Sequence, residues 1–213
     1  MAPELSRLGE SSHLYRDLCE AFYNSWRHPD KRATVRSIYH VTESEFDQSY
    51  RGRRFLEYCI RGGGRFKRRY HGTRRACLVG ERGHVLELCD NGECGVCGIL
   101  KHSFRIPREC RGSMFGNGVY STTVSSKADI FAENHHIHST LHVIFICRVV
   151  TNRPQYLRRP DSCRTRPDPG FDSVEAVTVR NGGRVMYPET IVYREDAIVP
   201  VAVVMYTRQE WLP

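Results

Sequence analysis

The chain has 213 residues, of which 40% are hydrophobic, and its lysines and arginines outnumber its acidic residues by 32 to 24, for a formal net charge of +8. This length can bury one sizeable core, so we expect a single domain over residues 1–213. No apolar run has the length of a signal peptide or of a membrane span, which argues against secretion and membrane insertion and for an intracellular location, nuclear or cytoplasmic. The positive charge favours anionic partners such as phosphates, nucleic acid or acidic protein surfaces.

Apolar periodicity along the chain predicts an α+β fold in which strands outnumber helices. Helices are expected over residues 9–27, 43–60 and near 126–134. Strands are expected over residues 35–41, 65–70, 141–150, 174–179, 189–195 and 198–206. A long loop rich in Cys and Gly (73–111) and a connection rich in Pro and Arg (151–170) separate them. Because the helices are not regularly interleaved with the strands, the sheets should be largely antiparallel.

Four of the nine cysteines fall in one polar, glycine-rich stretch, separated by 11, 4 and 2 residues: Cys77, Cys89, Cys94 and Cys97. The last two form a Cys-x-x-Cys pair, which can grip one tetrahedral ion. We therefore predict a structural zinc ion within an insertion at about 77–97, with His84 or His102 able to replace one ligand. A redox-active pair and free thiols are the alternatives.

Two other stretches have simpler interpretations. Histidines 135, 136, 138 and 142 gather near a predicted junction between helix and strand, but no cysteine spacing accompanies them, so a polar junction explains them. The segment RFKRRY (65–70) has the composition of a nuclear localisation signal. Because it lies on a predicted strand, a solvated basic strand face is the interpretation we favour.

Three short stretches combine residue types that suit a binding site: HGT (71–73), GNGVY (116–120) and ETIVY (189–193). The histidine ring can donate a hydrogen bond, and a glycine lets another molecule approach the backbone closely. The second stretch offers open backbone amides beside the ring of Tyr120, although a hairpin with the tyrosine in the core would give the same pattern. Glu189 stands at the start of an apolar strand, where a carboxylate is costly unless it is paired or functional.

In this order the three stretches resemble the catalytic domain of poly(ADP-ribose) polymerase-like ADP-ribosyltransferases of the His-Tyr-Glu class. The similarity covers about residues 9–207 and includes VRSIYHV followed by Phe46, and FDSVEA at 171–176. The cysteine-rich insertion is similar to one in a fungal-type subgroup. The resemblance implies an NAD cleft between two small, mostly antiparallel sheets with flanking helices.

The resemblance also implies roles for single residues. His71 would hold the adenosine ribose of NAD, Tyr120 would stack on nicotinamide, and the backbone of Gly72 would meet the carboxamide. Thr73 would support the ribose end of the substrate. Glu189 would stabilise the positive charge that builds on the ribose as nicotinamide leaves, because a nearby carboxylate favours the transition state more than the ground state.

Three further positions follow the family pattern to different degrees. Lys127 matches a family lysine near the substrate, although a solvated surface lysine would also explain it. Phe131 stands where the family has Tyr and can still form the second side of the ring sandwich. Ala128 stands where the family often has Ser, so one hydrogen bond to the carboxamide is lost, worth about 0.5 to 1.5 kcal/mol.

The expected function is NAD-dependent transfer of ADP-ribose to a macromolecular acceptor, either protein or nucleic acid. The resemblance leaves open whether single units or polymers are transferred. An NAD glycohydrolase, with water as the acceptor, is the alternative enzyme. A non-catalytic basic zinc module that binds nucleic acid or ADP-ribose is the alternative from a different class.

Overall fold

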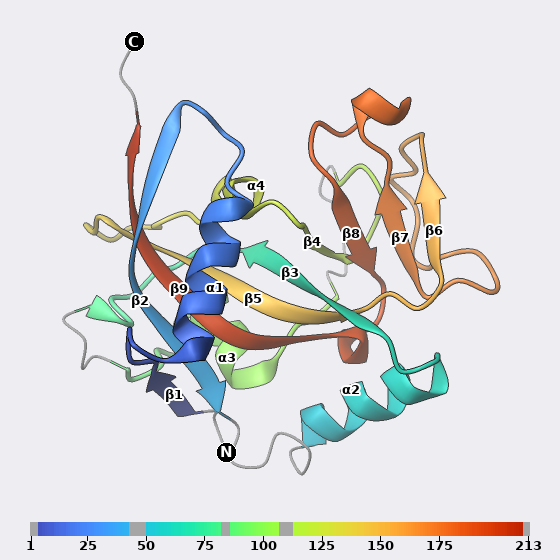
Figure 1. Ribbon diagram of the computed structural model, residues 1–213. Coiled ribbons are helices and arrows are strands. Elements are labelled where there is room, and N and C mark those ends of the chain that lie inside the picture. The colour runs from blue at the N-terminus through green and yellow to red at the C-terminus, as the bar shows by residue number, and fades with distance from the viewer. Residues whose placement is uncertain (1–3, 43–49, 82–85, 107–112, 211–213) are drawn as a thin grey trace.

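The computed structural model describes residues 4–42, 50–81, 86–106 and 113–210, and its strands form two sheets (Figure 1). The first sheet has the order β1 (Glu4–Arg7), β2 (Lys31–Thr42), β9 (Ile198–Glu210), β5 (Leu141–Val150) and β3 (Phe66–Gly72). The second has the order β4 (Val119–Ser121), β8 (Glu189–Val192), β7 (Ser173–Ala176) and β6 (Pro154–Leu157). Neighbouring strands are antiparallel except β6 and β7, which confirms the predicted α+β class with largely antiparallel sheets.

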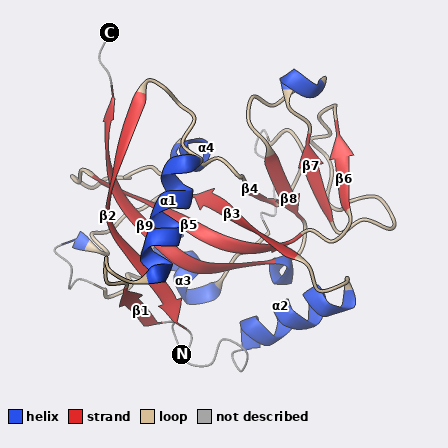
Figure 2. Ribbon diagram, viewed as in Figure 1, coloured by secondary structure: helices blue, strands red, loops and turns tan. Residues whose placement is uncertain are grey.

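Helices cover both faces of the five-stranded sheet (Figure 2). They are α1 (His13–Asn24), α2 (Tyr50–Arg61), α3 (Gly95–His102) and α4 (Ser125–Asp129), with short 3-10 helices at Val179–Asn181 and Glu195–Ala197. Successive residues of β5 alternate between the two faces, as a strand requires. Ile144 packs in the cluster that includes Leu18 of α1, whereas Phe145 packs with Phe55 of α2 and Leu100 of α3. None of the helices in the described ranges has the length and apolar character needed to span a bilayer.

Several boundaries differ from those predicted. Strands β1, β4 and β6 were not expected, and β2 begins four residues earlier than predicted. The predicted strands at 174–179 and 189–195 end at Ala176 and Val192. Helix α2 is described only from Tyr50, so residues 43–49, including Phe46, lie outside the described part, and α4 is shorter than predicted.

Helix α3 is the largest difference, because it lies inside the segment that we expected to be a loop. Gly95 and Gly98 lower its intrinsic helix propensity. Burial compensates for this weakness, since Val96, Cys97 and Leu100 are completely or almost completely removed from solvent. Tertiary packing therefore decides the conformation of this segment.

Strand β3 joins the two sheets. Tyr70 and Thr122 exchange backbone hydrogen bonds of 2.8 and 2.9 Å, which connects β3 to the end of β4. The buried guanidinium of Arg69 donates to Thr190 Oγ1 over 2.8 Å and to Glu175 Oε1 over 2.9 Å, so it links β3 to β8 and β7. This ion pair fixes the second sheet next to the strand that carries His71.

Removing Arg69 should therefore destabilise the protein strongly. In Arg69→Met the Glu175 carboxylate, only 13% exposed, would be left without its partner. Breaking a buried pair from one side costs about 3 kcal/mol or more. Arg68→Met is the matched control, because Arg68 pairs with Asp17 at the surface and such pairs contribute less than about 1 kcal/mol. Urea denaturation of both variants measures the difference, and equal losses of stability would contradict the assigned link between the sheets.

Candidate active site

The three stretches that were singled out in the sequence meet in one pocket of about 840 Å³. Strand β3, α4 and the starts of β4 and β8 form part of its wall, and α3 with the cysteine-rich turn before it forms another part. All the residues predicted to contact NAD line this pocket: His71, Gly72, Thr73, Tyr120, Lys127, Phe131 and Glu189. The fold thus brings together side chains that are more than a hundred positions apart in the chain.

The imidazole of His71 is held in one tautomer. Its Nδ1 lies 2.7 Å from the carbonyl oxygen of Tyr120, and because a carbonyl only accepts, Nδ1 must carry the proton. The ring also packs edge-on against Phe104, with 4.9 Å between ring centroids. Burial lowers the pKa of His71, while the contact with the Tyr120 carbonyl raises it less. The neutral ring therefore leaves Nε2 as a hydrogen-bond acceptor.

The ring of Tyr120 is held by its own hydroxyl group. That hydroxyl accepts from the backbone N–H of Phe115 over 2.9 Å and donates to the carbonyl oxygen of Gly116 over 3.1 Å. Gly116 has φ +77°, a conformation that glycine adopts without strain. Tyr120 packs against a buried cluster and also lines the pocket, so it is not simply a core residue.

Opposite charges meet at the start of β8. The Lys127 ammonium lies 3.1 Å from Glu189 Oε1, and both side chains are largely shielded, with 21% and 13% of their surface exposed. The same ammonium lies 5.2 Å from the ring centroid of Phe131, close enough for a cation–π contact. Phe131 itself is 55% exposed, which leaves an aromatic face at the edge of the pocket.

Strand β3 and α4 approach each other so closely that only glycine fits between them. A Cβ atom at Gly72 would lie 1.8 Å from the carbonyl oxygen of Ala128. The neighbouring serines of α4 do not replace the hydroxyl that Ala128 lacks, because they bond elsewhere. Ser125 donates to the carbonyl of Phe22, and Ser126 accepts from the backbone N–H of Arg27.

The four predicted cysteines form a compact group, with all Sγ atoms within 4.8 Å of one another. Cys77 Sγ lies 3.7 Å from Cys94 Sγ and 3.5 Å from Cys97 Sγ. Four sulfurs at a zinc–sulfur distance of about 2.3 Å would be about 3.8 Å apart at the corners of a tetrahedron. The backbone N–H of Ala76 donates to Cys94 Sγ over 3.4 Å, which favours a negatively charged sulfur. The residues fit a tetrahedral thiolate site.

Of the two histidines considered as substitute ligands, only His102 is in the described part of the chain, and it does not join this group. His102 lines the pocket but is not among the clustered ligand atoms, and His84 lies outside the described residues.

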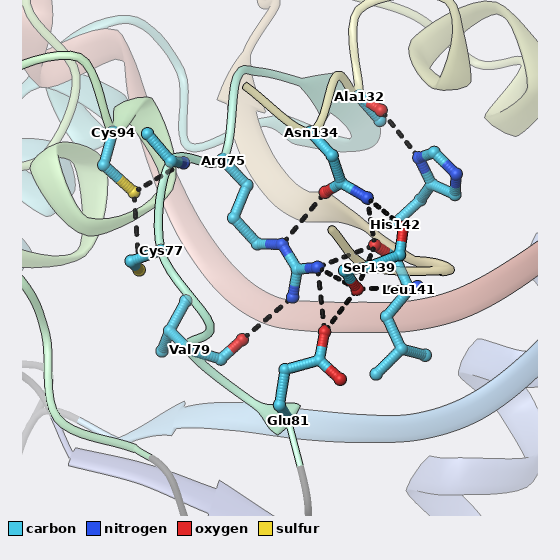
Figure 3. Close-up of polar contacts among 11 residues, drawn as sticks. Arg75, Cys77, Val79, Glu81, Cys94, Ala132, Asn134, Ser139, Leu141 and His142 are labelled. Carbon is cyan, nitrogen blue, oxygen red and sulfur yellow. Dashed lines mark hydrogen bonds and ion pairs between the residues drawn. The ribbon is translucent and has the colours of Figure 1, made fainter. Parts of the chain in front are cut away.

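A buried arginine, Arg75, is the centre of the polar network drawn in Figure 3. Arg75, only 1% exposed, follows the HGT stretch and precedes Cys77. Its guanidinium donates to five acceptors, two from residues 79–81 and three from residues 134–141. They are the carbonyl of Val79, Glu81 Oε1, Asn134 Oδ1, Ser139 Oγ and the carbonyl of Leu141. The loop that follows α4 is thereby joined to the segment that carries Cys77.

Two contributors to the site were missed in the sequence. Phe104, which supports His71, follows α3 in a segment predicted to be a loop, and no local signal marks it. Arg75 lies in RRAC, where it looked like one of many surface arginines. An arginine between two candidate sites was the available signal, but its burial depends on partners more than fifty residues away.

A family model described as the Poly(ADP-ribose) polymerase catalytic domain matches residues 12–210. The chain belongs to this family. Membership agrees with the two-sheet fold and assigns NAD-dependent ADP-ribosyltransferase activity in general terms. No match was found among curated proteins.

The lowered pKa of His71 should make the stability of this ADP-ribosyltransferase domain depend on pH. Below an unfolded-state pKa of about 6.5, the unfolded chain binds a proton that the folded imidazole resists, so stability falls as the pH falls through that value. His71→Gln, which keeps a donor for the Tyr120 carbonyl, should lose less stability between pH 7.5 and pH 5.5. Urea denaturation at both pH values measures the loss of stability. An equal loss in the wild type and in His71→Gln would contradict the role of His71 in this pH dependence.

Proposed function

We propose that the domain transfers ADP-ribose from NAD to a macromolecular acceptor, with Glu189 as the residue that carries catalysis. The observation behind this proposal is that the Glu189 carboxylate, the Tyr120 ring and the His71 imidazole line a single pocket. The carboxylate is largely shielded from water. In such an environment a fixed charge acts more strongly on a developing charge than it does in solvent.

Binding would use groups that are already in place. The free Nε2 of His71 would accept from a hydroxyl of the adenosine ribose, and the face of Tyr120 would stack on nicotinamide. Phe131 would cover the other side of the ring. The backbone of Gly72 would meet the carboxamide, and Thr73, which lies against Gly95, would support the ribose end. Because the hydroxyl of Tyr120 is fully engaged, the ring needs no reordering to receive its ligand.

Cleavage of the bond between nicotinamide and ribose leaves positive charge on the ribose, and nicotinamide departs as a neutral base. Glu189 would stabilise that charge and then orient or deprotonate the incoming nucleophile. Lys127 would hold the carboxylate in position through their 3.1 Å contact. Transfer to a macromolecule and hydrolysis share these steps and differ only in the nucleophile.

We also propose that Cys77, Cys89, Cys94 and Cys97 hold one structural zinc ion. Their clustered sulfur atoms and the N–H donor on Cys94 support this. The ion would fix the turn ahead of α3, and Asn91, Gly92 and Gly95 of that segment line the pocket. Free thiols persist in reducing compartments, where disulfides are rare, which agrees with the intracellular location expected from the sequence.

Glu189→Gln tests the catalytic proposal. The substitution keeps the size of the side chain and removes its negative charge, so nicotinamide release should fall by roughly 100-fold or more. NAD affinity should change far less. Single-turnover release of nicotinamide and NAD titration measure the two effects, and Glu133→Gln, at an exposed glutamate outside the pocket, is the control.

The products decide between the alternatives. Release of nicotinamide at the native rate by Glu189→Gln would refute the role. Mass spectrometry after incubation with NAD and cell extract should find ADP-ribose on a protein or nucleic acid. Free ADP-ribose alone would favour the glycohydrolase, and no turnover in the wild type would favour the non-catalytic zinc module.

Cys97→Ser tests the zinc proposal. Elemental analysis of the purified wild type should find zinc, and the variant should bind it far more weakly and melt at a lower temperature, since structural zinc contributes on the order of 10 kcal/mol to folding a small site. Cys163→Ser, at an exposed cysteine outside the group, should behave as the wild type. Wild-type protein without metal, together with unchanged melting of Cys97→Ser, would contradict it.

A further inference from the structure

Three side chains outside the cysteine group also place ligand atoms together: Glu93, His135 and His136. We propose that they form a second metal site, for a divalent ion such as Zn²⁺, that is distinct from the thiolate site and from the NAD pocket. Glu93 belongs to the turn before α3, and the two histidines belong to the loop that follows α4. Imidazole nitrogens with a carboxylate oxygen suit zinc and its neighbours among the transition metals.

The spacing of the ligand atoms supports this proposal. All three atoms lie within 4.8 Å of one another, and His135 Nε2 lies 3.4 Å from Glu93 Oε2. That separation is long for a hydrogen bond between nitrogen and oxygen. It matches two ligands of one ion, because bonds of about 2.0 to 2.1 Å place tetrahedral neighbours about 3.3 Å apart.

His135 Nε2 provides a second and independent observation. The atom is buried, yet it has no hydrogen-bond partner among the described residues. A buried polar atom without a partner costs free energy, which a bound ion would recover. The negatively charged carboxylate of Glu93 also lies beside that nitrogen, where it would help to bind a cation.

The backbone holds both segments in place before any ion binds. The N–H of His135 donates to the carbonyl of Arg75 over 2.8 Å, so the buried arginine fixes the start of the histidine pair. On the other segment, the N–H of Glu93 donates to Asn91 Oδ1 over 2.9 Å. His136 has φ +53°, an uncommon conformation for a residue other than glycine, and its ring centroid lies 3.9 Å from that of His135.

The position of the site indicates a structural role. An ion there would connect the turn at 91–95, several residues of which line the pocket, to the loop that begins after Phe131, itself a pocket residue. Water would complete the coordination, since the protein offers three ligands. The ion would thus hold the turn at 91–95 and the loop after Phe131 in a fixed position relative to each other.

Zinc titration with a competing chelator tests the site. The full chain should bind two equivalents, and the weaker one should be lost in Glu93→Gln and in His136→Asn, with affinity reduced roughly 100-fold or more. Asparagine tolerates the positive φ at residue 136, so this variant should fold. His138→Asn, an exposed histidine of the same loop outside the group, is the matched control and should keep both equivalents.

Cobalt distinguishes the two sites, because thiolates give intense charge-transfer absorption that nitrogen and oxygen ligands do not. The equivalent lost in His136→Asn should lack those bands, and Cys97→Ser should still bind it, so failure of the thiolate site would not hide the second one. Loss of thiolate bands in His136→Asn, a wild type with no equivalent beyond the thiolate site, or two equivalents retained in both variants would each overturn the proposal.

Discussion

The arrangement of the segments around the site depends on the hydrogen bonds that the buried Arg75 guanidinium makes. Taking a guanidinium out of water is costly unless its donors are satisfied, and here five acceptors surround it. Its backbone also pairs with the segment from Glu133 to His135. The segment that leads from β3 into the cysteine-rich stretch and the loop after α4 are therefore parts of one polar network. A substitution that moves one of these segments should therefore alter the hydrogen bonds that hold the other.

Local motifs allowed much of this site to be predicted. His71, Tyr120 and Glu189 were singled out because their three short stretches, taken in order, resemble the catalytic domain of the family, and the structure brings them to one pocket. The strongly periodic strands β5 and β9 lie within a few residues of the predicted ranges. The spacing of the cysteines, which depends on ligand geometry, was similarly informative.

Features that depend on distant partners could not be read from the sequence. Helix α3 contains two glycines and forms because Val96 and Leu100 are buried against residues far away in the chain. His135 and His136 were interpreted as a polar junction, because nothing near them indicates that Glu93 lies within reach. Short β6 was missed for the same reason, since its pairing with β7 depends on a connection of irregular sequence.

The position of β9 in the first sheet constrains when this domain can fold during its synthesis. This strand lies between β2 and β5 and pairs with both, although it comes after all the other described strands in the sequence. Until residues 198–210 have left the ribosome, the edges of β2 and β5 that pair with β9 have no hydrogen-bonding partner. Closure of such long chain segments is slow, because distant contacts must form before they stabilise the chain. During that interval the nascent chain exposes unpaired strand edges, which make incompletely folded chains prone to aggregation.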